Sequence, residues 1–183
     1  PTYDAYVTMM NQFAATYPNL CRIVNAGTTI QGRQILFAVI SDNVNTPEAE
    51  PKFMYTSTMH GDETTGYILM LRLIDYLLSR YPADPKVTGL VNNIEIWINP
   101  NANPDGTYRG GNGTVNGAVR YNANNYDLNR NFPAIDYPNT APIQPETQSF
   151  MNLADANYFR LSANFHGGAE VLNYPWDSWQ RLT

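Results

Sequence analysis

Two histidines and one glutamate are the residues whose types and spacing could bind a metal ion. His60 and His166 each follow an apolar segment and precede a glycine, and Glu63 lies three residues after His60. Taken alone, a histidine at the end of a strand is more often a structural residue than a metal ligand. Two imidazoles and a carboxylate with an open fourth position, however, form a donor set used by catalytic zinc sites. Zinc fits these donors better than magnesium or iron, although the spacing leaves an iron site with two histidines and one carboxylate open.

A second polar cluster lies in a long irregular segment. It comprises Asp127, Asn129 and Arg130, with Arg120 ten residues before Arg130. A solvated loop with ordinary salt bridges would have this composition too. The guanidinium fork of an arginine matches a carboxylate, and a second arginine near a metal can stabilise an oxyanion. Asp127 is suited to orient an imidazole that binds the metal.

Length and composition exclude several classes of protein. The chain of 183 residues, 43% of them hydrophobic, is long enough for one core, so a single domain over residues 1–183 is expected. The net charge of -5 comes without basic runs, which argues against nucleic acid as a partner. No apolar run approaches the roughly 18–20 residues that span a bilayer.

The compartment is indicated only by composition. The chain begins at Pro1 without a segment typical of a signal peptide, so the protein is either intracellular or has lost a signal before this numbering begins. The 13 tyrosines and 13 prolines indicate a loop-rich protein, and a secreted or periplasmic hydrolase is favoured. Cys21 is the single cysteine of the sequence and is expected to be a buried thiol.

The first third of the chain reads as a helix followed by a hairpin. Apolar residues recur at spacings of three and four over residues 3–17, which predicts an amphipathic helix ending before Pro18. Apolar runs at 21–24 and 35–41, separated by a turn-rich segment at 27–32, predict a β-hairpin.

A strand and a broadly buried helix frame the first histidine. Residues 53–59 are expected to form a buried strand that ends at His60. A helix is expected over residues 66–78, with Asp62 capping it through the backbone N–H of Thr65.

The remaining segments alternate between strands, turns and one helix. A short strand at 94–98 precedes residues 99–106, which are expected to form only turns, and residues 106–145 show almost no periodicity. A helix at 145–157 and a strand at 158–165 follow, and this strand ends at His166. The pattern predicts an α/β fold whose sheet is covered by helices on both faces. Because ligands of such sheets bind beyond the carboxyl ends of the strands, both histidines are expected at that edge.

Four sequence blocks, taken in order, resemble the zinc metallocarboxypeptidases of the carboxypeptidase A/B superfamily. They are residues 60–63 (HGDE), 103–106 (NPDG), 127–132 (DLNRNF) and 162–168 (SANFHGG). The last block, continued to residues 173–177 (NYPWD), is most similar to the regulatory branch of carboxypeptidase N and E type. The resemblance implies a mixed sheet with helices on both faces. It also implies a single zinc ion bound by His60, Glu63 and His166, with Asp127 as the partner of the His60 imidazole.

The resemblance also implies an activity, the removal of the last residue of a peptide by zinc-activated water. Arg120 would polarise the scissile carbonyl, and Asn129 with Arg130 would bind the terminal carboxylate of the peptide or protein substrate. The general-base glutamate and the capping tyrosine of the family lie downstream of the third ligand. Glu170 is the only nearby glutamate and does not occupy the family position, so a surface carboxylate is its simpler interpretation.

Two further readings of the chain stay open. Because the expected base and the pocket residues lie beyond Thr183, we expect a truncated domain, incomplete at its carboxyl end and with an exposed sheet edge. An inactive fragment or pseudoenzyme that binds zinc and peptide C-termini is one alternative to an active monomeric carboxypeptidase. A related zinc hydrolase of cell-wall peptides is the other.

Overall fold

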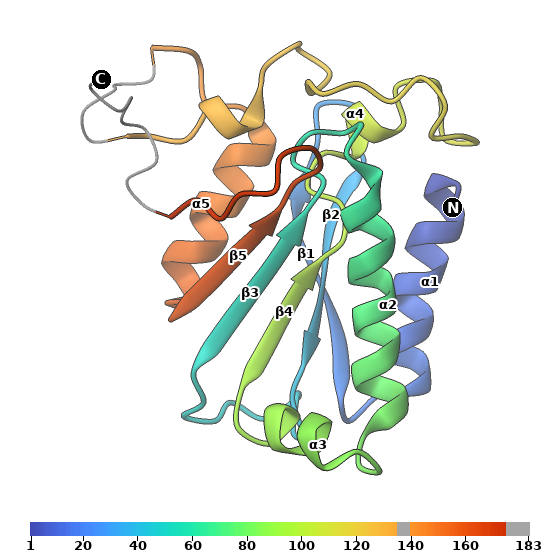
Figure 1. Ribbon diagram of the computed structural model, residues 1–183, viewed down its shortest axis with the longest axis vertical. Helices are drawn as coiled ribbons and strands as arrows, with labels where there is room; N and C mark the ends of the chain where they lie inside the picture. Colours follow the sequence, from blue (N-terminus) through green and yellow to red (C-terminus); the bar gives the residue numbers. More distant parts are fainter. Residues whose placement is uncertain (135–139, 175–183) are drawn as a thin grey trace.

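A mixed sheet of five strands forms the centre of the computed structural model, which describes residues 1–134 and 140–174 (Figure 1). The strands lie in the order β1-β2-β4-β3-β5. Their bounds are β1 Cys21–Thr28, β2 Gln34–Ile40, β3 Lys52–Ser57, β4 Glu95–Asn99 and β5 Leu161–Phe165.

The pairing of the strands divides the sheet into two parts. β1 and β2 form the predicted antiparallel hairpin, and β2 also pairs antiparallel with β4. β3 lies between β4 and β5 and runs parallel to both. The carboxyl ends of β3, β4 and β5 therefore meet at one edge of the sheet, at the top of Figure 1.

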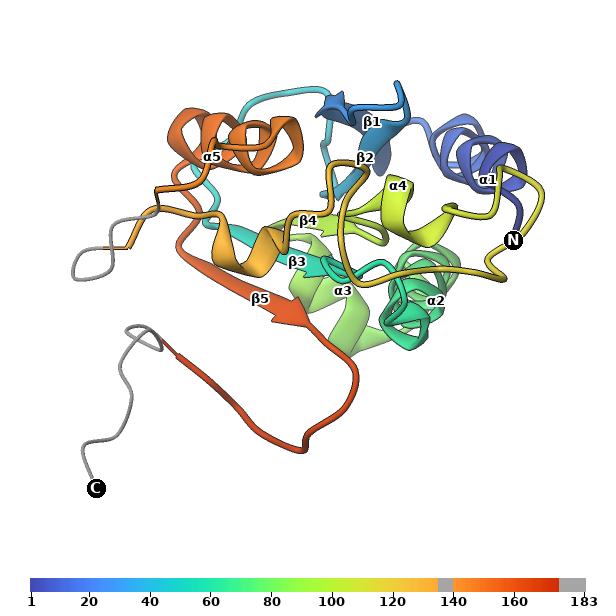
Figure 2. The same ribbon diagram turned by 90° about the horizontal axis from the view of Figure 1, so that it is seen from above.

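Helices cover both faces of this sheet, as the sequence predicts (Figure 2). The helices α1 (Tyr3–Thr16), α2 (Thr64–Arg80) and α3 (Pro85–Val91) lie on one face, and α5 (Pro145–Asn157) lies on the other. The predicted α1 is confirmed, with the hydroxyl of Thr2 capping its first turn, and it ends ahead of Pro18. The predicted bounds of α5 match the observed ones.

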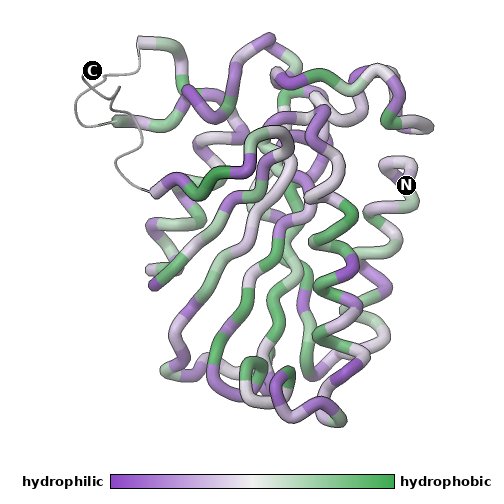
Figure 3. The backbone as a smooth tube through the Cα atoms, viewed as in Figure 1, coloured by the Kyte–Doolittle hydropathy of each residue, from purple (hydrophilic) through white to green (hydrophobic). Residues whose placement is uncertain are grey.

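The strand β2 shows why the sheet needs two covering layers. Ile35, Phe37 and Val39 pack in the core beneath α5, whereas Leu36, Ala38 and Ile40 pack in the core beneath α1 and α2. All six side chains are buried, so this strand has no face that tolerates water. Figure 3 shows hydrophobic residues along the central strands and mostly hydrophilic ones in the loops beyond their carboxyl ends.

Two local predictions were wrong, and one short helix was missed. Asp62 does not cap α2 with its side chain: the helix begins at Thr64, Glu63 is the N-cap without a side-chain bond, and Asp62 contributes only its carbonyl oxygen. The segment at 99–106 does not consist of turns alone, because α4 (Pro104–Thr107) forms where the Asn103 side chain accepts from the N–H of Gly106. The helix α3 was not predicted, although Asp84 caps it and Pro85 begins it.

The described sheet ends at β5. Leu161 on this strand is 66% exposed, so the edge is open to solvent, as expected. Among the described helices none is long and apolar enough to cross a bilayer.

Candidate metal centre

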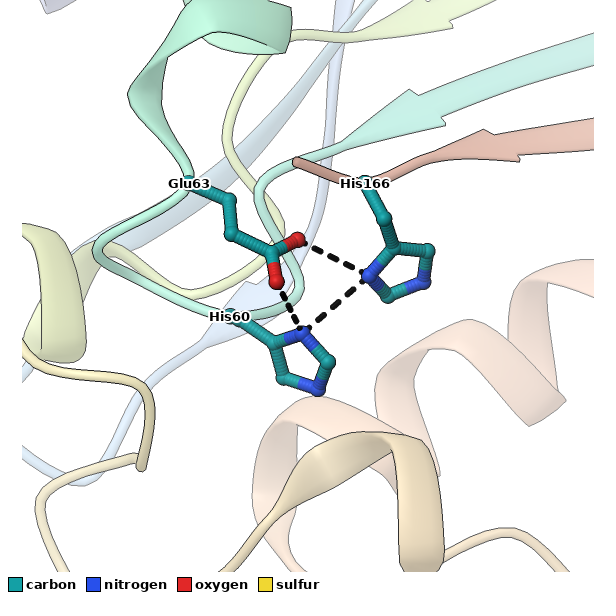
Figure 4. Close-up of side chains that lie close together, drawn as sticks. All are labelled: His60, Glu63 and His166. Atoms are coloured by element: carbon teal, nitrogen blue, oxygen red, sulfur yellow. Dashed lines mark hydrogen bonds and ion pairs between the residues drawn. The ribbon is translucent and has the colours of Figure 1, made fainter. Parts of the chain in front are cut away.

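Three side chains from two neighbouring strand ends converge on one point (Figure 4). His60 follows β3 and His166 follows β5, and these strands are parallel neighbours with Ser57 opposite Phe165. Glu63 occupies the N-cap of α2, directly after the turn that His60 begins. The pairing of β3 with β5 thus brings together residues 60 and 166.

The donor atoms of this cluster are spaced as metal ligands are. Nδ1 of His60 lies 2.8 Å from one oxygen of Glu63, and Nδ1 of His166 lies 2.9 Å from the other. The two Nδ1 atoms are 3.1 Å apart. Zn–N distances of about 2.0–2.1 Å place tetrahedral ligand atoms about 3.3 Å apart, so a small shift of these side chains would accommodate the ion. Nitrogen and carboxylate donors together suit zinc.

The turn between His60 and Glu63 rests against α4. The hydroxyl of Thr107 donates to the carbonyl of Gly61 at 3.0 Å, and the amide of Asn103 donates to the carbonyl of Met59 at 3.2 Å. Gly61 packs so closely that an added Cβ would overlap the backbone of Gly106 and Thr107. The block at 103–106 therefore supports the segment that carries two of the three donors.

The Glu63 carboxylate is held by more than the two imidazoles. The N–H of Gly167 donates to it at 2.9 Å, and the hydroxyl of Thr58 donates to the Glu63 carbonyl at 3.2 Å. Burial alone would raise the pKa of Glu63, but the hydrogen bonds from Gly167 and His60 and the nearby imidazoles hold it below its ordinary value. Glu63 is therefore an anion over the whole neutral range.

Asp127 connects His60 with Arg120. One oxygen of Asp127 lies 3.1 Å from Nε2 of His60, and the other accepts from Nε and Nη2 of Arg120 at 3.0 and 2.9 Å. Burial raises the pKa of Asp127, but the Arg120 hydrogen bonds and His60 outweigh it and lower this pKa. Nη1 of Arg120 reaches within 3.2 Å of Nδ1 of His60. Arg120 is thus held beside the donor atoms of the candidate centre.

Asn129 and Arg130 lie one turn further on, in the short 3₁₀ helix Leu128–Arg130. Both side chains are exposed, and the Arg130 guanidinium donates to the carbonyl of Asn129 at 3.0 Å. Among the described residues no carboxylate forms an ion pair with Arg130, whose side chain is exposed. Glu170 is also exposed, and no hydrogen bond to a described residue brings it to the ligand cluster. Of the continued block at 173–177, residues 175–177 lie outside the described residues.

A buried carboxyl group anchors the loop that carries Arg120 and Asp127. Glu146, fully buried in the first turn of α5, accepts from the amide of Asn122 at 3.2 Å, and Gln144 accepts from the same amide at 3.0 Å. The Asn122 side chain also accepts from the N–H of Tyr126 at 2.9 Å. Burial, followed by the nearby Asp105 carboxylate, raises the pKa of Glu146 above its ordinary value, although the Asn122 amide offsets part of this.

Replacing Glu146 with glutamine is expected to change how stability depends on pH. Because the pKa of Glu146 is raised in the folded state, the protonated carboxyl group stabilises the wild type. This contribution is fully present below the pKa of the unfolded state, about 4.3, and is lost as the pH rises through the pKa of the folded state. Glutamine cannot ionise, so its own contribution does not change with pH. The free energy of unfolding of the variant, relative to that of the wild type, should therefore rise with pH by about 1.4 kcal/mol for each unit by which the pKa of Glu146 is raised. Urea unfolding at pH 4, 6 and 8 measures this, and a difference that stays constant with pH would contradict it.

Sequence reasoning missed two contributors to this site. The Asn164 amide lies 3.0 Å from Nε2 of His166, and Gly167 donates its backbone N–H to Glu63. The position of Asn164 carries a usable signal, because residues two apart on a strand share one face. The contact of Gly167 with Glu63 arises only when β5 pairs with β3, so no local sequence pattern predicts it.

Comparison with known proteins agrees with this geometry. A family model described as zinc carboxypeptidase matches residues 6–182. The chain is 44% identical over 170 residues to carboxypeptidase D of Mus musculus, a match that covers 92% of this chain and 12% of that protein. It is 40% identical over 187 residues to carboxypeptidase M of the same species, covering 95% of this chain and 40% of the relative. The chain thus spans well under half the length of these relatives.

Solved structures show the same fold. The carboxypeptidase A of Helicoverpa armigera superposes with a TM-score of 0.76 at 24% identity, over 92% of this chain and 46% of that one. Bovine thrombin-activatable fibrinolysis inhibitor superposes with a TM-score of 0.78 at 16% identity, over 95% and 63% of the two chains. The five-stranded sheet and its covering helices are therefore shared with larger proteins.

Proposed function

Because this chain belongs to the zinc carboxypeptidase family, we propose that the full-length protein removes C-terminal residues from peptides with one zinc ion held by His60, Glu63 and His166. The observation that carries the proposal is the convergence of these three side chains, whose donor atoms all lie within 4.8 Å of one another. Bound zinc supplies Lewis-acid chemistry, lowering the pKa of water and polarising a carbonyl. We place residues 1–183 within a single catalytic domain.

Asp127 and Arg120 act as a pair in this proposal. The Asp127 carboxylate accepts from Nε2 of His60 and so leaves Nδ1 free of its proton and directed at the ligand cluster. The same carboxylate holds Arg120 through two hydrogen bonds, which fixes the direction of its guanidinium. Arg120 Nη1 then donates to the oxyanion that forms when the scissile carbonyl is attacked.

Asn129 and Arg130 recognise the substrate's terminal carboxylate. An exopeptidase must select a free terminus, and a planar guanidinium beside an amide matches a carboxylate better than a lysine does. Arg130 is exposed and has no described anionic partner, which leaves its donors available to a substrate. Asn129 comes directly before it in the same 3₁₀ helix.

Turnover of matched peptides by the full-length protein tests this assignment. The wild type is expected to release the last residue from a peptide with a free carboxylate, to lose that activity to a chelator, and to regain it with zinc. Replacing Arg130 with leucine is expected to lower kcat/KM for the free acid by about 10- to 150-fold, the equivalent of roughly 1.5–3 kcal/mol for hydrogen bonds to a charged group. The C-terminal amide of the same peptide should be a poor substrate for both proteins.

The exposed Arg72 provides the matched control. It lies on α2, outside the loop that carries Arg120 and Asp127, so Arg72→Leu should leave kcat/KM unchanged. Equal turnover of acid and amide by the wild type would refute recognition of the carboxylate. Binding of the peptide acid without turnover, measured by calorimetry, would instead identify a binding protein. Turnover of peptidoglycan stem peptides alone would identify a cell-wall hydrolase.

A further inference from the structure

The two imidazoles of the candidate metal centre have different outer partners. Both rings direct Nδ1 at Glu63 and at each other, and both direct Nε2 away. Nε2 of His60 meets the Asp127 carboxylate, whereas Nε2 of His166 meets the neutral amide of Asn164 at 3.0 Å. We infer that Asn164 is a positioning residue that orients His166 toward the metal, an inference that rests on the proposed function.

The strand β5 sets the place of Asn164. Asn164 and His166 are two residues apart and so project to the same face, and Asn164 lies opposite Thr56 in the parallel pairing with β3. The hydroxyl of Thr56 is 3.0 Å from Oδ1 of Asn164, and Nδ2 of the amide also approaches the sulfur of Met59 at 3.7 Å. The amide is therefore held between β3 and the His166 ring.

The tautomer of a metal-binding imidazole determines which group Asn164 must present to it. An imidazole that binds a metal through Nδ1 keeps its proton on Nε2, and this N–H needs an acceptor. A half-turn of the Asn164 amide presents Oδ1 to that N–H and turns Nδ2 toward the Thr56 hydroxyl, which can accept as well as donate. All three groups are then satisfied.

Asn164 and Asp127 differ in the histidine tautomers with which they can form a hydrogen bond. A carboxylate only accepts, so Asp127 fixes the proton of His60 on Nε2. An amide presents either an acceptor or a donor, so Asn164 can meet His166 with its proton on either nitrogen. The outer partner of one ligand is thus anionic and that of the other is neutral.

Zinc affinity of full-length variants, measured by competition with a chromophoric chelator, tests this role. Asn164→Leu removes the acceptor and should weaken zinc binding by about 10- to 100-fold, the usual effect of losing an outer partner of a ligand. Asn164→Asp restores an acceptor of the same shape and should bind zinc at least as tightly as the wild type. Ser162→Ala, two residues earlier on β5 and exposed, is the control and should match the wild type.

A second readout separates orientation of the ring from damage to the strand. The ring nitrogens of His166, observed by ¹⁵N NMR in the zinc-loaded proteins, should show a proton on Nε2 that exchanges slowly in the wild type and in Asn164→Asp. In Asn164→Leu this proton should exchange faster. Wild-type zinc affinity in Asn164→Leu, or equal losses in the leucine and aspartate variants, would overturn the inference. Failure of the wild type itself to bind zinc would refute the metal centre, and with it this role.

Discussion

Replacing Glu63 with glutamine is expected to reduce zinc affinity by more than the roughly 10- to 100-fold that follows loss of an outer partner. Glu63 is the anionic donor of the cluster, and its two oxygens each face one histidine nitrogen. The lowered pKa of Glu63 shows that its surroundings favour the negative charge. A neutral amide would present N–H groups to these nitrogens and to Gly167. Carboxypeptidase activity should fall with the bound zinc.

Chelator competition and metal analysis of the purified full-length variant measure this effect. Asp155→Asn makes the corresponding change at an exposed position of α5 and should bind zinc as the wild type does. Excess zinc should restore part of the activity if weak binding is the whole defect. A Glu63→Gln variant that holds zinc with wild-type affinity would show that the metal, if bound, lies elsewhere.

Replacing Gly61 with alanine is expected to destabilise the fold by about 3 kcal/mol, the upper end of the range for overpacking. The new Cβ would overlap the backbone of Gly106 and Thr107, which cannot turn aside as a flexible side chain would. Either α4 or the turn that carries His60 and Glu63 must then move. Zinc affinity should therefore fall together with stability, even though Gly61 itself supplies no ligand.

Gly89 offers a control of opposite sign. It lies inside α3, and a Cβ there would meet nothing within 4 Å. Gly89→Ala should therefore raise stability by up to about 1 kcal/mol through helix propensity, without any effect on zinc. Urea unfolding of the three proteins, with and without zinc, gives both comparisons. Wild-type stability in Gly61→Ala would mean that the contact with α4 is not as tight as the structure shows.

The elements that could be predicted are those whose pattern is local. Spacings of three and four predicted α1, two apolar runs separated by a turn-rich segment predicted the β1–β2 hairpin, and the predicted bounds of α5 were correct. The signal for α3 was also present, because Asp84 followed by Pro85 is a good helix start, but a helix of seven residues is too short for periodicity to reveal. The prediction that the Asp62 side chain caps α2 was wrong, because the helix begins at Thr64 and the turn before it is supported by α4.

The order of the strands could not be predicted, because it depends on contacts between distant segments. β4 lies between β2 and β3 although it follows both in the sequence, and β5 crosses over to pair with β3. The spacing of His60 and Glu63 was local and visible. The expectation that His166 would join them rested on the general rule for strand ends, and the geometry agrees with it. The two hydrogen bonds from Arg120 to one oxygen of Asp127, and the contact of the Asn164 amide with His166, could be found only in the folded structure.

The position of β5 at the edge of the described sheet ties two properties of the protein together. Two of the three donors lie within six residues after β3, whereas the third follows β5, which pairs with one strand in the described sheet. Opening the β3–β5 pairing would remove one ligand while leaving the other two in place. By linkage, an ion that binds all three donors closes that pairing and protects its backbone amides from exchange. A bound metal ion would then stabilise the pairing of β5 with β3 in addition to supplying the Lewis-acid chemistry of the site.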